Sequence, residues 1–182
     1  MAEDTDQRIV VIGSPGSGKS TLARILAAHT RLPLIHLDRE HWLPGWVEPD
    51  KTEWNARAAA FATGPRWIIE GQYSSSLPSR LARATLVIWL DLPTAACLWG
   101  VVKRTVAYRG RSRPDMAEGC PERLEATFLW YVLTFRRRIR PGVRALLAAS
   151  DVPVMRVRSR RDRRRFIDQG MARLASSRIE MP

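Results

Sequence analysis

The residues best suited to chemistry stand near the start of the chain, in the sequence GSPGSGKS at positions 13–20. This segment fits the phosphate-loop pattern G-x-x-x-x-G-K-[ST] at every constrained position. Its glycines let the backbone turn tightly and aim consecutive N–H groups at one point, where the dipole of a following helix also favours negative charge. The pattern predicts a polyphosphate site formed by Gly13, Ser14, Pro15, Gly16, Ser17, Gly18, Lys19, Ser20 and Thr21.

Two side chains of this loop have expected roles in catalysis. A lysine at the position of Lys19 reaches the β- and γ-phosphates of a bound nucleotide, and a hydroxyl at the position of Ser20 ligates the bridging Mg²⁺. Residues 9–12 form an apolar run typical of a buried strand, and apolar residues recur at helical spacing after the loop. This strand–loop–helix context argues against a chance glycine-rich turn and predicts ATP and Mg²⁺ as cofactors.

Two carboxylates follow the next apolar runs. Residues 32–37 are expected to form a second strand that ends at Asp38, and residues 66–69 a third that ends at Glu70. Ligands of open α/β sheets bind beyond the carboxyl ends of the strands, so both acids should face the phosphate loop. Asp38 could position Mg²⁺ or accept a proton from an attacking hydroxyl, with a turn or helix-capping role as the alternative. Glu70 is a further candidate metal ligand beside Ser20 and Asp38.

A basic stretch follows the fourth predicted strand. It runs from Lys103 through an arginine-rich segment at 109–121, which we expect to be a lid. An arginine supplied by a closing lid would stabilise charge on a transferring phosphoryl group, and closure would also exclude water. A solvated basic loop is the alternative.

Residues 39–64 are expected to form an insert on the acceptor side of the site. Trp42 and Trp46 could enclose a planar acceptor, or they could fill a local core. Asp50 and Glu53 form a capping-box pattern that opens a helix ending near Gly64.

Further strands are predicted at 86–91 and 152–157. Further helices are predicted from Pro93 to about Gly110, from Pro121 to Arg138 and around 143–149, and Ser159 with Asp162 suggests a capped final helix. Buried strands that alternate with helices indicate a three-layer α/β fold with a five-stranded, mostly parallel sheet.

The composition indicates one soluble domain spanning 1–182. Two distant cysteines suggest neither disulfides nor a zinc site, and the acidic segment 1–7 does not resemble a signal peptide, so we expect a cytoplasmic protein without membrane association. The net charge of +12 comes mostly from arginine and implies attraction to anions. It could equally reflect a general bias in composition.

The motifs together resemble adenylate-kinase-like nucleoside and nucleotide kinases, and more closely the family of DNA topology modulation proteins. The resemblance rests on GSPGSGKSTLA (13–23), IHLD (35–38), PGWV (44–47), WIIEGQYS (67–74) and RGRSRPDMAEGCPE (109–122), and it covers most of the chain. It implies a strand order of 2-3-1-4-5, and it implies that Arg109, Arg111 and Arg113 are lid arginines that clamp the donor and transferring phosphates. The family usually has Asp-Gly-Asn where this chain has Glu70-Gly71-Gln72, and the acceptor-binding arginine of adenylate kinases has no counterpart at Gln72–Ser74.

Two functions follow as hypotheses. The first is ATP-dependent phosphoryl transfer to a small acceptor, which could be a nucleotide, a nucleoside or a hydroxylated metabolite. The second is a nucleotide-dependent DNA-binding or regulatory protein, for which non-specific, salt-dependent contact with nucleic acid is expected. Its candidate surface is the carboxyl-terminal run of Arg156, Arg158, Arg160, Arg161, Arg163, Arg164 and Arg165.

Overall fold

Five apolar runs form one parallel sheet in the computed structural model, which describes residues 7–170. The strands are β1 (Arg8–Gly13), β2 (Leu34–His36), β3 (Trp67–Glu70), β4 (Leu86–Leu90) and β5 (Val154–Val157). Their order is β2-β3-β1-β4-β5, and every neighbouring pair is parallel. The predicted fold class and strand order are therefore confirmed.

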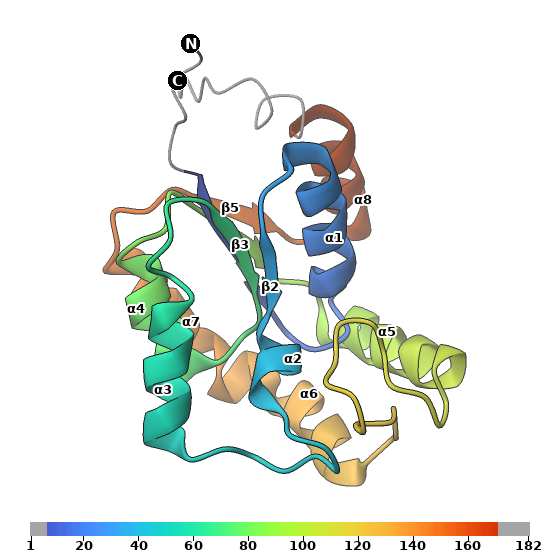
Figure 1. Cartoon of the computed structure of the whole chain (residues 1–182). Coiled ribbons are helices and arrows are strands. Elements are labelled where there is room, and N and C mark those ends of the chain that lie inside the picture. The colour runs from blue at the N-terminus through green and yellow to red at the C-terminus, as the bar shows by residue number, and fades with distance from the viewer. Residues whose placement is uncertain (1–6, 171–182) are drawn as a thin grey trace.

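Helices surround this sheet (Figure 1). They are α1 (Lys19–Thr30), α2 (Leu37–His41), α3 (Lys51–Ala60), α4 (Leu77–Leu81), α5 (Thr94–Ala107), α6 (Ala126–Arg138), α7 (Arg140–Ala148) and α8 (Arg160–Arg165). A 3₁₀ turn spans Ser74–Ser76, and a π-helical turn spans Phe166–Gly170. Within residues 7–170, none of the helices has the length and apolar character needed to cross a membrane.

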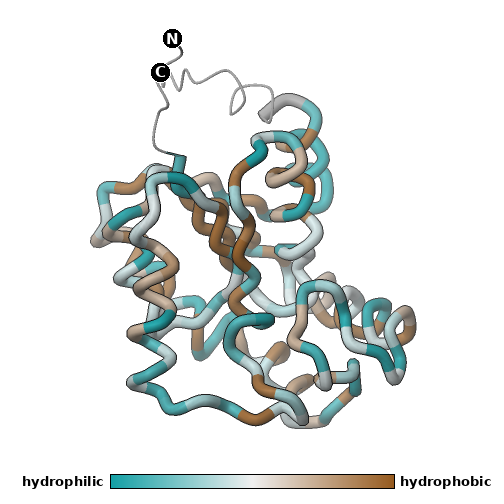
Figure 2. Tube along the Cα trace, viewed as in Figure 1, coloured by the Kyte–Doolittle hydropathy of each residue, from teal (hydrophilic) through white to brown (hydrophobic). Residues whose placement is uncertain are grey.

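The core has two layers, one on each face of the sheet. Alternation along β1 sends Ile9 and Val11 to one layer and Val10 and Ile12 to the other. The first layer packs against α1, α5 and α6, and the second against α3, α4 and α7. Figure 2 shows the strands as the most hydrophobic part of the trace, as expected for a parallel sheet covered on both faces.

The register of the sheet brings the polar strand ends together. Gly13 pairs with Leu90 of β4, and His36 of β2 pairs with Glu70 of β3. The phosphate loop, the residues after β2 and the residues after β3 thus leave the sheet at one edge. This edge is where the sequence placed the candidate site.

Several predicted element boundaries are wrong, and two of them lie beside the candidate site. The second strand ends at His36, and Leu37 instead begins α2, so Asp38 is a helical residue. The helix expected from Pro121 begins only at Ala126. Glu122 cannot start it because its N–H donates to the carbonyl of Arg111 and its side chain is drawn into ion pairs with arginines.

Two helix caps match the predictions. The Asp50 side chain accepts hydrogen bonds from the N–H groups of Thr52 and Glu53 at the start of α3. The Ser159 hydroxyl accepts from the N–H of Asp162 at the start of α8. Of the acidic segment 1–7, residues 1–6 lie outside the described part of the chain.

Candidate active site

The phosphate loop leaves β1 at Gly13 and enters α1 at Lys19. Gly16 and Gly18 have φ angles of 74° and 89°, which side chains other than glycine rarely adopt. The Lys19 ammonium donates to the Ser14 carbonyl at 3.2 Å and so folds back over the loop. The N–H of Gly13 donates to the Gln72 side-chain oxygen at 3.1 Å, which ties the loop to the end of β3.

Glu70 lies beneath the loop and is almost fully buried. One carboxylate oxygen is 2.9 Å from Nδ1 of His36, and the other is 4.0 Å from Nζ of Lys19. Glu70 therefore acts as a buried counter-charge to the loop lysine in this arrangement. The assignment of Glu70 as a metal ligand stays a prediction.

Asp38 accepts a hydrogen bond from the Tyr73 hydroxyl at 2.9 Å. Burial, followed by the nearby charge of Glu70, raises the pKa of Asp38 above its ordinary value, while Lys19 and Arg113 act in the opposite direction. A carboxylate with a raised pKa beside a phosphate loop is a reasonable proton acceptor.

Arg80 organises the loop that carries Gln72 and Tyr73. It is fully buried, and its guanidinium donates to the carbonyls of Gly71, Gln72 and Tyr73 and to that of Ser76. Burial lowers the pKa of Arg80 to about 9. Sequence reasoning missed this residue because a single arginine in a short helix is usually a surface residue. The carbonyls that it binds come from positions four to nine residues before it, and they converge only because of how the chain turns after β3.

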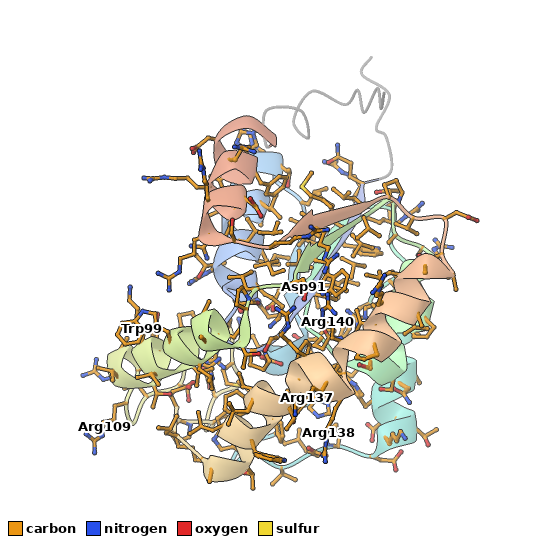
Figure 3. The ribbon with its side chains drawn as sticks, turned by 180° about the vertical axis from the view of Figure 1, so that it is seen from behind. Asp91, Trp99, Arg109, Arg137, Arg138 and Arg140 are labelled. Atoms are coloured by element: carbon orange, nitrogen blue, oxygen red, sulfur yellow. The ribbon has the colours of Figure 1, made fainter. Side chains whose placement is uncertain are left out.

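The predicted lid arginines have different environments. Arg113 is buried, and its guanidinium contacts Asp115 at 2.9 Å and Glu122 at 2.7 Å. The contact with Glu122 is an ion pair whose angle lies outside hydrogen-bond geometry. Arg109 and Arg111 are exposed. Figure 3 shows Arg109 at the outer edge of the molecule.

The lid segment packs against the insert. Trp42 and Trp46 meet edge to face, with ring centroids 5.3 Å apart, and they contact a small cluster of Met116, Ala117 and Cys120. Backbone contacts add to this packing, because the N–H of Gly45 donates to the carbonyl of Gly119 at 2.9 Å. Both tryptophans are thus partly engaged in a local core while still lining the cleft.

These elements enclose one large cleft of about 1240 Å³. Of the predicted residues, it is lined by Pro15–Thr21, Asp38 and Arg113. The lining of the cleft does not include five of the predicted site residues, which are Gly13, Ser14, Glu70, Arg109 and Arg111. The cleft continues from the phosphate loop to Trp42 and Tyr73, so one cavity joins the loop to the aromatic residues of the insert.

The residues around Ser20 provide oxygen atoms of the kind that Mg²⁺ prefers. Asp115 lines the cleft with Ser20 and Asp38. Although burial acts to raise it, the pKa of Asp115 lies below its ordinary value because of Arg113 and the Ser20 hydroxyl. In residues 7–170, no group of three or more His, Cys, Asp or Glu side chains is placed to hold a metal by itself. A magnesium ion shared with nucleotide phosphates and water fits these donors.

Asp115 was not a predicted site residue. The sequence feature that could have indicated Asp115 was its position in the arginine-rich segment 109–121, two residues after Arg113. Its place beside Ser20 is visible only in the fold, which brings residues 109–121 to the phosphate loop.

Comparisons with known proteins support the fold. No family model matches the chain, and no curated protein matches its sequence. Among solved structures, it resembles shikimate kinase from Acinetobacter baumannii in complex with shikimate, at 13% identity with 97% of each chain covered and a TM-score of 0.57. A gluconokinase from Sinorhizobium meliloti matches at 18% identity, 94% and 95% coverage and a TM-score of 0.51.

A deoxyadenosine kinase from M. mycoides with bound products matches at 13% identity, 93% and 99% coverage and a TM-score of 0.52. The chain has the P-loop kinase fold. At these identities the likeness extends to the fold alone, because the same fold accommodates different chemistries.

Proposed function

We propose that this chain is an ATP-dependent phosphotransferase that moves the γ-phosphate of Mg-ATP to a hydroxyl of a small acceptor. The observation that carries the proposal is the shared cleft, in which the phosphate loop, Asp38 of α2 and Tyr73 after β3 line one cavity. A polyphosphate on the loop would point its terminal phosphate toward the space beside Asp38. Positioning and charge stabilisation are the main requirements for phosphoryl transfer.

Each residue has a distinct role in this proposal. Lys19 binds the β- and γ-phosphates, and Ser20, with Asp38 and Asp115 nearby, holds the Mg²⁺ that offsets phosphate charge. Asp38 takes the proton of the acceptor hydroxyl or positions the metal. Arg113 stabilises charge on the transferring group, and Arg109 and Arg111 would join it only if the lid moves further inward.

The experiment is a screen of nucleosides, nucleotides, sugars and small alcohols for phosphorylation by ATP and Mg²⁺. Lys19→Ala should abolish transfer and weaken ATP binding roughly 10- to 100-fold, because a charge-assisted contact contributes about 1.5 to 3 kcal/mol. Lys51→Ala is the matched control, since Lys51 is an exposed lysine at the start of α3 and does not line the cleft. Unchanged ATP affinity in folded Lys19→Ala protein, measured by calorimetry, would remove the proposal.

A nucleotide-dependent DNA-binding role, as the resemblance to DNA topology modulation proteins suggests, is the weaker candidate. Its basic run is divided in the fold: Arg156 contacts Asp91, while Arg160 and Arg163 line the cleft. A β-carbon added to Gly18 would lie 2.4 Å from the Arg163 guanidinium, so this arginine reaches the phosphate loop. Sequence-selective DNA binding that survives about 200 mM salt and responds to ATP would favour this role instead.

A further inference from the structure

The arginine-rich helix α8 begins beside the phosphate loop. Gly13 of β1, Leu90 of β4 and Val157 of β5 lie in one row across the sheet, so β5 ends at the same edge as the loop. Phe166, the residue after α8, is buried in the core layer that also contains residues of α1. Figure 1 shows α8 close to α1. The fold therefore fixes the start of α8 near the point where the loop enters α1.

Two of the five arginines of α8 face the cleft. Arg160 and Arg163 are among the residues that line it. They stand three positions apart, which places them on one side of a helix. The lining does not include the other arginines of the helix, which are Arg161, Arg164 and Arg165. One side of α8 thus belongs to the wall of the candidate active site.

Arg163 reaches the phosphate loop itself. A β-carbon added to Gly18 would lie 2.4 Å from Nη1 of Arg163 and 3.7 Å from its Cζ, so the guanidinium occupies the space that a side chain at position 18 would need. Gly18 immediately precedes Lys19 and α1. In a phosphate loop, the backbone N–H groups at this point face the bound phosphates. The Arg163 guanidinium is therefore placed where it can contact the same phosphates.

The Arg163 guanidinium has no partner within residues 7–170. The structure gives it neither an ion pair nor a hydrogen bond there, although it is only partly exposed. Arg113, by comparison, is shared between the carboxylates of Asp115 and Glu122. An unpaired guanidinium can bind an anion without displacing another group, and its planar fork offers two parallel N–H donors to a phosphate.

The strand order indicates which phosphates Arg163 can reach. Asp38 and Tyr73 come after β2 and β3, on one side of β1, whereas α8 comes after β5 on the other side. The proposed acceptor site lies beside Asp38, so the γ-phosphate would point toward the side of β2 and β3. Arg163 approaches from the opposite side, where the α- and β-phosphates of the donor would lie.

We propose that Arg163 is a catalytic residue that binds the α- and β-phosphates of the donor nucleotide and stabilises the charge that develops on the leaving group. In the transfer, the bond between the γ-phosphorus and the β–γ bridging oxygen breaks, and this oxygen keeps the electron pair. The γ-phosphorus forms its new bond with the acceptor oxygen, whose proton passes to Asp38 or to water. A guanidinium beside the β-phosphate offsets the negative charge that accumulates there. This inference rests on the proposed function, because it assigns a residue to the donor side of that same site.

The first test measures nucleotide binding. ADP and ATP are titrated with Mg²⁺ into wild type, Arg163→Ala and Arg164→Ala by calorimetry. Arg163→Ala should bind both nucleotides about tenfold or more weakly, because both carry the α- and β-phosphates. Arg164→Ala is the matched control, since Arg164 is an exposed arginine of the same helix that does not line the cleft, and its affinities should equal those of wild type. Unchanged ADP affinity in Arg163→Ala, or an equal loss in Arg164→Ala, would overturn the inference.

Urea unfolding separates a contact with nucleotide from a structural role. Arg163 loses no ion pair or hydrogen bond within residues 7–170 when it is truncated, so Arg163→Ala should unfold at the same urea concentration as wild type. Weaker nucleotide binding that is accompanied by a lower urea midpoint would assign Arg163 a structural role and contradict the inference.

The second test concerns the chemical step. Turnover at saturating ATP, with the acceptor found by the screen, should fall by about 10²-fold or more in Arg163→Ala and should be partly restored in Arg163→Lys, which retains the charge. An unchanged kcat in Arg163→Ala would overturn the catalytic role. Wild-type protein that binds no ATP or phosphorylates no acceptor would contradict the proposed function. Transfer that depends on Lys19 but not on Arg163 would leave the proposed function standing and remove only this inference.

Discussion

Gly100 of α5 packs directly against the backbone of Gly16 in the phosphate loop. A β-carbon added to Gly100 would lie 2.1 Å from the Gly16 carbonyl oxygen, and one added to Gly16 would lie 2.1 Å from the Cys97 carbonyl. Contacts this short leave no room for a methyl group on either side. The position of the phosphate loop is therefore set partly by a helix that begins about 75 residues later in the chain.

Gly100→Ala should destabilise the protein and weaken ATP binding, because the added methyl group must push α5 and the loop apart. Overpacking of this kind costs about 1–3 kcal/mol. Gly142→Ala in α7 is the matched control, because a β-carbon there meets no atom within 4 Å. Gly142→Ala should raise the free energy of unfolding of the protein by up to about 1 kcal/mol, because alanine is a better helix former than glycine. Urea unfolding and ATP titration of both variants test this difference. Equal changes in stability and ATP affinity in Gly100→Ala and Gly142→Ala would contradict the prediction.

Arg113 should contribute more to turnover than the other two predicted lid arginines. It lines the cleft, whereas Arg109 and Arg111 are exposed outside it. Arg113→Lys keeps the charge but loses the fork that contacts two carboxylates, and we expect turnover to fall by about 10²-fold or more with a smaller effect on ATP affinity. If Arg109→Ala or Arg111→Ala lowers turnover as much, the lid must close further than it does here.

Asp38→Asn should lower turnover by about 10² to 10⁴ if Asp38 accepts the acceptor proton. In that case the dependence of the rate on Mg²⁺ concentration should be the same in variant and wild type. A large increase in the Mg²⁺ requirement would assign Asp38 to metal positioning instead. Full activity of the variant would exclude both roles.

Tyr73→Phe tests the same carboxylate through its hydrogen bond. The Tyr73 hydroxyl favours the ionised form of Asp38, so its removal should raise the Asp38 pKa further. A base with a higher pKa remains protonated to higher pH, and the acid limb of the pH–rate profile should move toward alkaline pH. An unchanged limb, measured as kcat/KM against pH, would show that Asp38 is not the group that titrates.

Asp91 should stabilise the fold at the carboxyl ends of β4 and β5. This residue after β4 contacts Arg140 at 2.8 Å and also Arg156, and Figure 3 shows Asp91 and Arg140 close together. Asp91→Asn should lower the free energy of unfolding by about 2–3 kcal/mol at neutral pH, because two arginines lose their shared counter-charge. Asp151→Asn, at an exposed position, is the control and should change the free energy of unfolding by less than about 0.5 kcal/mol.

The loss of stability caused by Asp91→Asn should become smaller as the pH falls. Although burial acts to raise it, the pKa of Asp91 lies below its ordinary value because of Arg140 and Arg156. A depressed pKa stabilises the folded state above the unfolded-state pKa of about 4, and this contribution is lost as the pH falls through the lower folded-state value. The gap in stability between wild type and Asp91→Asn should therefore narrow in acid. A stability difference that grows in acid would show that the ion pairs with Arg140 and Arg156 do not stabilise ionised Asp91.

The amino-acid sequence by itself determined the phosphate loop, the alternation of strands and helices and the position of Glu70 at the end of a strand, whereas Asp38 proved to lie in α2, two residues after its strand. These features depend on local rules, because glycine spacing, apolar runs and capping residues act over a few neighbours. The caps at Asp50 and Ser159 formed as predicted for the same reason. Parallel pairing then brought the strand ends to one edge.

Only the tertiary structure decided which charged side chains are available in the cleft. Arg113, Arg109 and Arg111 look alike in the sequence, yet the fold buries the first against Asp115 and Glu122 and leaves the others in solvent. Likewise, the close approach of Gly100 to the phosphate loop arises between distant segments. Ion pairs and backbone contacts of this kind depend on the packing of whole elements, for which one sequence contains no local pattern.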